Sequence, residues 1–229
     1  MIHRVAIVLA LGVLPGQPQA PAPDTRIVFL YDAGRRFDAV PPEALFTART
    51  EYGRLMRGLI VQQIASQVGP ATVVRVGSAG ADVRLSAPWV RSQTDIRRAF
   101  EQVEQVSEPS PIWDGVCAAT AALADAPGRR ILILVTDGRA RGNRVGFADA
   151  LDCIRQTGTV VHAIRVHPRV GQGGWVEDLS VDPSDNLKAL AKACGGSFSE
   201  VKEDRFPFVL GELVKSTRAA PERWQTLIR

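Results

Sequence analysis

Two short runs of strongly apolar residues constrain the fold of this chain more than any other feature. Ile27–Tyr31 and Ile131–Val135 contain no charged residue, and an aspartate follows each run within two residues. Continuous apolar runs of this length are typical of strands that are buried on both faces of a parallel sheet. Elsewhere, apolar residues recur at the spacing of amphipathic helices. This alternation predicts an α/β fold, with a doubly wound, mostly parallel central sheet and helices on both faces.

The other elements are predicted from periodicity and from glycine and proline positions. A long helix is expected to begin at Pro41-Pro42 and to end at Gly69-Pro70. A hairpin that turns at Gly77–Gly80 is expected to add one antiparallel edge strand. Further helices are expected at 94–106, 113–126, 145–156, 186–194 and 206–216, with further strands at 160–166 and 197–201.

The N-terminal segment has the anatomy of a secretory signal peptide. Arg4 precedes the apolar run Val5–Leu14, and Pro15–Ala20 is rich in proline and small residues. The apolar run is too short to cross a bilayer as a helix. We therefore expect residues 1–20 to be removed, at a cleavage point that the sequence leaves open. The mature chain is expected in the periplasm or outside the cell, with no transmembrane helix, one domain at 25–217 and a C-terminal tail at 218–229.

Composition excludes several classes of protein. The chain is 45% hydrophobic and 23% charged, which is typical of a globular domain and not of a disordered chain. It has three histidines, including His3, which are too few for a zinc centre built from histidine. Its positive charge is spread along the chain instead of forming the basic patch that nucleic-acid binding requires, so no nucleic-acid partner is expected.

The cysteines leave two interpretations. Cys117, Cys153 and Cys194 all fall within predicted helices with apolar periodicity, where they are interpreted as small buried hydrophobic residues. In an oxidising compartment, the alternative is one disulfide with one free thiol. The sequence does not choose the pair.

Asp32 and Asp137 are the first candidate site residues, because each follows a predicted strand. In open α/β sheets, ligands bind outside the carboxyl ends of the strands, where the strand order reverses. If the two strands are neighbours there, the carboxylates face each other across a crevice and form a shared site. The alternative is that each aspartate only caps the loop or helix that follows it.

Three segments around these aspartates resemble ordered signatures of the von Willebrand factor type A (VWA) family. They are Arg26–Arg36 (RIVFLYDAGRR), Ser110–Asp114 (SPIWD) and Ile131–Gly138 (ILILVTDG). The resemblance covers about residues 25–217 and is greatest to the exported bacterial branch of the family. It implies a doubly wound sheet that binds a protein ligand at a metal-ion-dependent adhesion site.

By position, the resemblance implies a ligand-binding rim, the surface at the carboxyl ends of the strands. It contains Asp32, Gly34, Arg36, Ser110 and Asp137. Gly34 and Arg36 stand where the family has serine ligands, so their side chains supply no oxygen. Asp32, Ser110 and Asp137 are the metal candidates, and they are expected to hold Mg²⁺ or Mn²⁺ weakly at most. We expect no resident cofactor, with Arg36 neutralising the carboxylates in place of a metal.

Trp175 is the last candidate for the rim. It stands among glycines in the long loop His167–Asp185, which follows a predicted strand, and either anchors a partner or packs back over the sheet.

No catalytic motif is present, so a non-enzymatic function is expected. The predicted function is an exported module for protein–protein interaction or adhesion in the cell envelope, including an assembly scaffold. The alternative is a metal-dependent hydrolase that uses Asp32 and Asp137.

Overall fold

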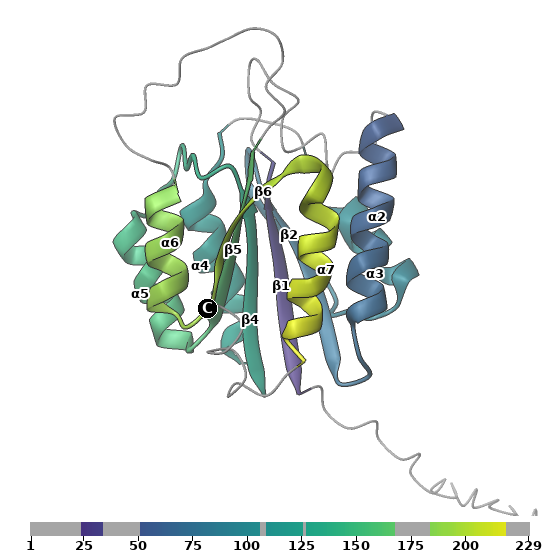
Figure 1. The fold of residues 1–229 in the computed structure, drawn as a ribbon. Coiled ribbons are helices and arrows are strands. Elements are labelled where there is room, and N and C mark those ends of the chain that lie inside the picture. Colours follow the sequence, from purple (N-terminus) through teal and green to yellow (C-terminus); the bar gives the residue numbers. More distant parts are fainter. Residues whose placement is uncertain (1–23, 34–50, 106–108, 126, 168–183, 219–229) are drawn as a thin grey trace, which may run out of the picture.

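The computed structural model describes residues 24–33, 51–105, 109–125, 127–167 and 184–218. These residues form a six-stranded sheet with the strand order β3-β2-β1-β4-β5-β6 (Figure 1). All neighbouring strands are parallel except β2 and β3, so the predicted doubly wound sheet with one antiparallel edge strand is confirmed. The strands are β1 (Thr25–Asp32), β2 (Thr72–Ala79), β3 (Val83–Leu85), β4 (Arg129–Thr136), β5 (Val160–His167) and β6 (Phe198–Lys202).

Helices cover both faces of the sheet. One layer contains α2 (Glu51–Gln67), α3 (Gln93–Val103) and α7 (Phe206–Ser216), which follows a short 3₁₀ turn at Glu203–Arg205. The other layer contains α4 (Ile112–Ala124), α5 (Phe147–Thr157) and α6 (Ser184–Ala193).

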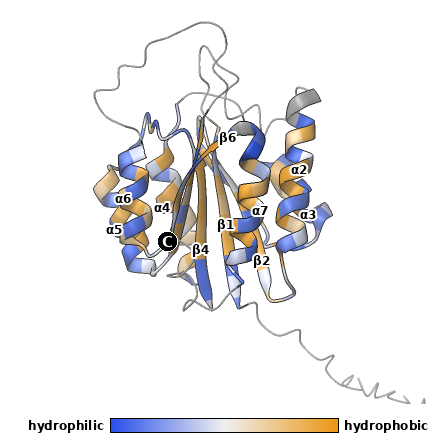
Figure 2. Cartoon of the chain, in the orientation of Figure 1, coloured by the Kyte–Doolittle hydropathy of each residue, from blue (hydrophilic) through white to orange (hydrophobic). Residues whose placement is uncertain are grey.

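Alternate residues of each central strand enter different hydrophobic clusters. Phe29 and Ile133 pack beneath the α2, α3 and α7 layer, whereas Leu30 and Leu134 pack beneath the α4, α5 and α6 layer. Figure 2 shows apolar residues along most of β1 and β4, with polar residues at their amino ends. Because both faces of these strands are buried, their sequences are continuously apolar and do not alternate.

One predicted turn is wrong. We expected the hairpin to turn at Gly77–Gly80, but β2 continues to Ala79, which pairs with Asp32 of β1. The turn falls instead between β2 and β3 at residues 80–82. At Gly77, an added Cβ would lie 2.6 Å from a side-chain carbon of Leu85, so glycine here permits the close approach of β3 and does not form the turn.

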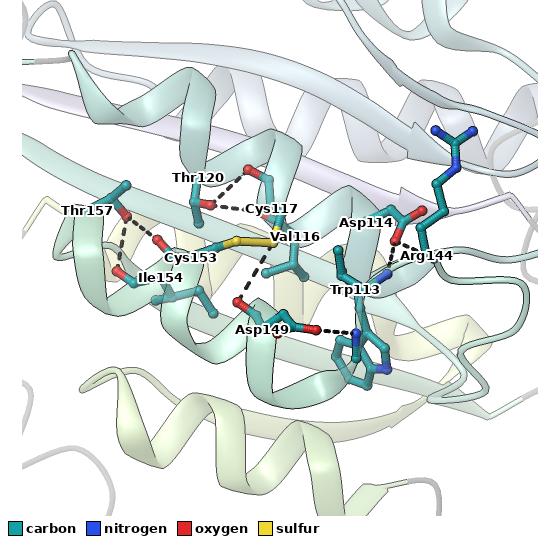
Figure 3. The surroundings of a disulfide bond; sticks show 12 residues. Trp113, Asp114, Val116, Cys117, Thr120, Arg144, Asp149, Cys153, Ile154 and Thr157 are labelled. Carbon is teal, nitrogen blue, oxygen red and sulfur yellow. Dashed lines mark hydrogen bonds between the residues drawn. A yellow bond between two sulfur atoms is a disulfide. The ribbon is translucent and has the colours of Figure 1, made fainter.

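The interpretation of the cysteines as buried hydrophobic residues is also wrong. Cys117 of α4 and Cys153 of α5 form a disulfide, with their Cα atoms 5.3 Å apart (Figure 3). Cys194 is a half-buried free thiol. The two helices lie side by side on one face of the sheet, which brings the cysteines within the separation that a disulfide requires.

Several predictions fall outside the described residues. They are the signal peptide at 1–20, the start of the long helix at Pro41-Pro42, and the C-terminal tail beyond Arg218. Among the described helices, none is long and apolar enough to cross a bilayer.

Candidate functional site

The candidate site lies where the strand order of the sheet reverses. The chain passes from β1 to β2 on one side and from β4 to β5 on the other, so the carboxyl ends of β1 and β4 form the switch point at which open α/β sheets bind ligands. Asp32 is the last residue of β1, and Asp137 directly follows β4. The pairing of Tyr31 with Val135 places the two aspartates at the same end of neighbouring strands.

Asp32 is held by two hydroxyl groups from different segments. The side chain is buried, with 3% of its residue surface exposed. The Ser110 hydroxyl donates to Asp32 Oδ1 at 2.6 Å, and the Thr136 hydroxyl donates to Asp32 Oδ2 at 2.8 Å. Thr136 Oγ1 in turn accepts the backbone N–H of Gly138 at 3.0 Å. The structure thus brings together Asp32 and Ser110, and it adds Thr136, which sequence reasoning missed.

Asp137 organises the loop that follows it. It is also buried, and its Oδ1 accepts the backbone N–H of Arg139 at 2.7 Å. The Asp137 backbone carbonyl accepts a hydrogen bond from Arg165 Nε at 3.2 Å. This carboxylate therefore has the capping role that was the alternative to a shared site.

Three arginines surround this strand end. The Arg141 backbone N–H donates to the Ser110 carbonyl at 2.8 Å, and Arg165 forms an ion pair with Glu200 at 3.3 Å. The pKa of Arg139 is lowered, first by partial burial and then by the positive charges of Arg141 and Arg165. Arg139 therefore lies close enough to Arg141 and to Arg165 for their charges to act on it. We define the rim site as Asp32, Ser110, Thr136, Asp137, Arg139, Arg141 and Arg165.

The loops of the rim site are fastened to the first turn of α4. Asp114 Oδ1 accepts the backbone N–H groups of Arg144 and Val145, at 2.9 and 3.0 Å. The Trp113 backbone N–H donates to Asn143 Oδ1 at 2.7 Å, and its ring packs edge-on against Phe147. The loop after β4 and the segment before α4 are consequently held together as one surface.

The described side chains do not suit a divalent cation. Mg²⁺ requires about six oxygen ligands in near-octahedral geometry. Asp32 and Asp137 already accept hydrogen bonds, and three arginines supply positive charge nearby. Gly34, Arg36 and Trp175 lie outside the described residues, and the first two have no side-chain oxygen. Among the described residues, no three histidine, cysteine, aspartate or glutamate side chains form a group that could hold a metal.

His162 is the buried histidine of the described chain, and its contacts are structural. It lies in β5 with 1% of its surface exposed. Its Nδ1 lies 2.9 Å from Ser197 Oγ and 3.2 Å from the Ser197 backbone nitrogen, which donates to it. A histidine that packs in this way supports the strand in which it lies and the segment before β6. It lends no support to the alternative of a hydrolase, which needs a base within reach of a substrate.

Thr136→Val is expected to destabilise the protein by about 1–3 kcal/mol, because it removes a hydroxyl donor from the buried Asp32 carboxylate without changing shape. It also removes the acceptor of the Gly138 N–H. Thr136→Ser retains the hydroxyl and is the matched control. Urea unfolding of both variants tests the role of the hydroxyl. An equal loss in the two variants would show that the methyl group matters instead.

Comparison with solved structures shows that this chain has the doubly wound fold of VWA domains. An aerotolerance-related membrane protein from Bacteroides fragilis NCTC 9343 matches with a TM-score of 0.56 and 11% identity, over 84% of this chain and 99% of that one. Proximal thread matrix protein 1 from the mussel byssus, with zinc in its metal-ion-dependent adhesion site (MIDAS) motif, matches with a TM-score of 0.59 and 19% identity. That match covers 86% of this chain and 46% of the thread protein.

A von Willebrand factor type A structure from Catenulispora acidiphila matches with a TM-score of 0.57 and 13% identity, over 87% of this chain and 43% of that one. The chain therefore has the VWA fold, as its three sequence segments predict. It spans less than half of the thread protein and of the Catenulispora protein, so the fold is one part of those longer chains. No family model and no curated protein sequence matches this chain.

Proposed function

We propose that this chain is an exported binding module that captures a protein partner at the rim site. The observation that supports this most is the construction of the rim. Asp32 and Thr136, from neighbouring strand ends, and Ser110, from the segment before α4, are joined by hydrogen bonds at the switch point of the sheet. Ligand sites in open α/β sheets lie at this position. A fixed surface of this kind suits recognition, because little has to be ordered on binding.

The charge of the rim site favours an acidic partner surface. Arg139 lies near Arg141 and Arg165, and Arg165 pairs with Glu200. The two aspartates of the rim site are buried, whereas Arg141 is exposed and can meet a partner. Guanidinium groups bind carboxylates through paired hydrogen bonds. Complementary charge speeds association, and this effect becomes weaker as the salt concentration rises. Capture should therefore decline as ionic strength rises.

Export to the periplasm or the extracellular space is the second part of the proposal. The signal-peptide anatomy of residues 1–20 supports it. The Cys117–Cys153 disulfide supports it independently, because structural disulfides persist in oxidising compartments and are rare where thiols are kept reduced. An envelope location would expose the rim site to surface or matrix proteins.

We propose further that Arg36 replaces a metal at the rim, and that Trp175 adds an apolar anchor beside it. Wild-type protein is then expected to bind Mg²⁺ and Mn²⁺ weakly at most. Gly34→Ser combined with Arg36→Ser restores two oxygen ligands and removes one positive charge, so divalent binding should appear or strengthen at least about tenfold. Fluorescence of the buried Trp113, three residues from Ser110, is the signal. Tight binding by the wild type, abolished by Asp137→Ala, would contradict this prediction.

Capture from envelope extracts tests the proposed function. The immobilised full chain is compared with Arg139→Glu/Arg141→Glu, and with Arg155→Glu near the end of α5 as a charge-reversal control outside the rim site. Reversing two rim charges is expected to lower capture of a specific protein at least about tenfold, because each charged contact contributes more than 1 kcal/mol. Chelator and Arg155→Glu should have no effect, and Trp175→Ala should weaken capture without lowering the melting temperature. Equal capture by the rim variant would contradict the proposal.

A further inference from the structure

The disulfide between α4 and α5 lies about one helical turn from the group that holds the β4–α5 loop of the rim, residues 137–146 (Figure 3). Cys117 follows Asp114 by three residues, and residues at this spacing lie on the same side of a helix. Asp114 Oδ1 accepts the backbone N–H groups of Arg144 and Val145, near the end of the loop. The disulfide and the attachment of the loop therefore share one side of α4.

The loop also leads directly into α5, which carries the second cysteine. The Gly146 backbone N–H donates to Asp149 Oδ2 at 2.8 Å, so the end of the loop is fixed to the first turn of α5. Cys153 lies four residues after Asp149, again on the same side of its helix. The disulfide thus joins the two helices to which the loop is attached.

The β4–α5 loop carries two arginines of the rim site. The Arg139 N–H donates to Asp137 Oδ1 at 2.7 Å, and the Arg141 N–H donates to the Ser110 carbonyl at 2.8 Å. The Ser110 hydroxyl in turn donates to Asp32. Because the loop is attached to both helices, a shift of α5 against α4 moves these arginines relative to Asp32.

Apart from the disulfide, α5 is held by few apolar contacts. It packs mainly against α4, and its buried residues are Ala150 and Ile154. Phe147 and Leu151 are only partly buried. Hydrophobic stabilisation is roughly proportional to the apolar area that is buried. The disulfide therefore supplies a large part of the attachment of α5.

The disulfide is accessible to a reductant, because Cys117 and Cys153 are both only half-buried. One thiolate of a dithiol reductant attacks the disulfide and forms a mixed disulfide with one cysteine, while the other cysteine leaves as a thiolate. The second thiol of the reductant then displaces the bound cysteine. The protein ends with two thiols and the reductant with one disulfide, so no further reactant is required.

We propose that reduction of the Cys117–Cys153 disulfide loosens the β4–α5 loop and thereby lowers partner capture at the rim site. The oxidised chain holds Arg139 and Arg141 in place. In the reduced chain, the loop has to be ordered when the partner binds, which lowers affinity through lost entropy. The control of capture rests on the proposed function, but the loosening of the loop does not.

Amide hydrogen exchange of the full chain, followed by ¹H–¹⁵N NMR, tests the loosening without a partner. A Cys194→Ser background removes the free thiol, so that dithiothreitol acts on the disulfide alone. The Arg144 and Val145 amides are expected to exchange at least about tenfold faster after reduction, because their hydrogen bonds to α4 open more often. Cys117→Ser/Cys153→Ser should reproduce this increase without reductant.

Two controls separate local loosening from a general loss of stability. The Asp95 amide donates to the Ser92 hydroxyl at the start of α3, on the other face of the sheet, and its exchange should change little. Leu210→Ala destabilises the chain through the opposite hydrophobic layer, because Leu210 is fully buried in α7. It should leave the exchange of the Arg144 and Val145 amides unchanged at the same temperature.

Capture from envelope extracts tests the second step. The protein to follow is the one whose capture is lost in Arg139→Glu/Arg141→Glu. The oxidised chain is expected to capture it at least about tenfold more strongly than the reduced chain or Cys117→Ser/Cys153→Ser, well below the melting temperature of each form. Leu210→Ala should capture it as the wild type does.

Equal exchange of the Arg144 and Val145 amides in the oxidised and reduced chains would overturn the proposal, as would an equal acceleration in Leu210→Ala. Faster exchange with unchanged capture would overturn the control of the rim site by the disulfide. If the oxidised chain captures no protein at the rim, the proposed function fails. The exchange rates still decide in that case whether the disulfide holds the loop.

Discussion

Removal of the disulfide between α4 and α5 is expected to lower the free energy of unfolding by about 4 kcal/mol. Cys117 and Cys153 are 36 residues apart, and their bond restricts the unfolded chain by closing a loop of that length. For a chain of this size, the melting temperature should fall by about 8–16 °C. Thermal unfolding of Cys117→Ser/Cys153→Ser measures the effect.

Two controls separate the cross-link from the loss of side-chain packing. Dithiothreitol should lower the melting temperature of the wild type nearly to that of the double variant, and should leave the double variant unchanged. Cys194→Ser should change stability little, because Cys194 is a free and only half-buried thiol. A wild type that melts at the same temperature with and without reductant would show that this disulfide contributes no stability.

Stability is also expected to fall by about 3 kcal/mol as the pH is lowered from about 6.5 to 4, because of His162. Burial lowers the pKa of His162 from 6.5 to about 4, and the charge of Arg129 lowers it further in the same direction. Between these two values the unfolded chain binds a proton that the folded chain does not. The contribution is therefore complete above the unfolded pKa and is lost as the pH falls towards the folded pKa.

Urea unfolding at a series of pH values tests this dependence. His162→Gln cannot take up the proton, so its stability should fall less than that of the wild type over the same pH range. The difference between the two curves isolates the contribution of His162 to stability from that of carboxylates, which titrate over part of the same pH range. Parallel curves would show that His162 is protonated equally in the folded and unfolded states.

Local sequence patterns predicted the elements of this fold well, because they depend on neighbouring residues. The continuous apolar runs identified β1 and β4 as central strands, and helical periodicity placed α7 at the residues where it is observed, Phe206–Ser216. Gly77 misled the prediction because glycine serves close approach as well as turns. Only the packing of β3 against β2 distinguishes these two uses.

Features of the rim site that depend on strand register could not be predicted. Arg165 lies at the rim because it is paired with Thr136 across β4 and β5. The hydroxyl of Thr136 contacts Asp32 because β1 and β4 are neighbours. Arg139 and Arg141 directly follow the TDG sequence, so the sequence did contain a signal for positive charge at the rim. It was missed because only the overall distribution of charge along the chain was considered. The cysteine pairing likewise required the contact between α4 and α5.

Site-specific photo-crosslinking in the native cell tests most directly whether the rim site captures a partner. A photoreactive residue replaces the exposed Arg141 at the rim, or the exposed Arg155 near the end of α5 as the control. We expect one discrete adduct with another envelope protein from position 141 alone, which persists in chelator and is lost when Arg139→Glu is added. Adducts of equal yield from both positions, or an adduct from position 155 alone, would contradict the assignment of partner binding to the rim.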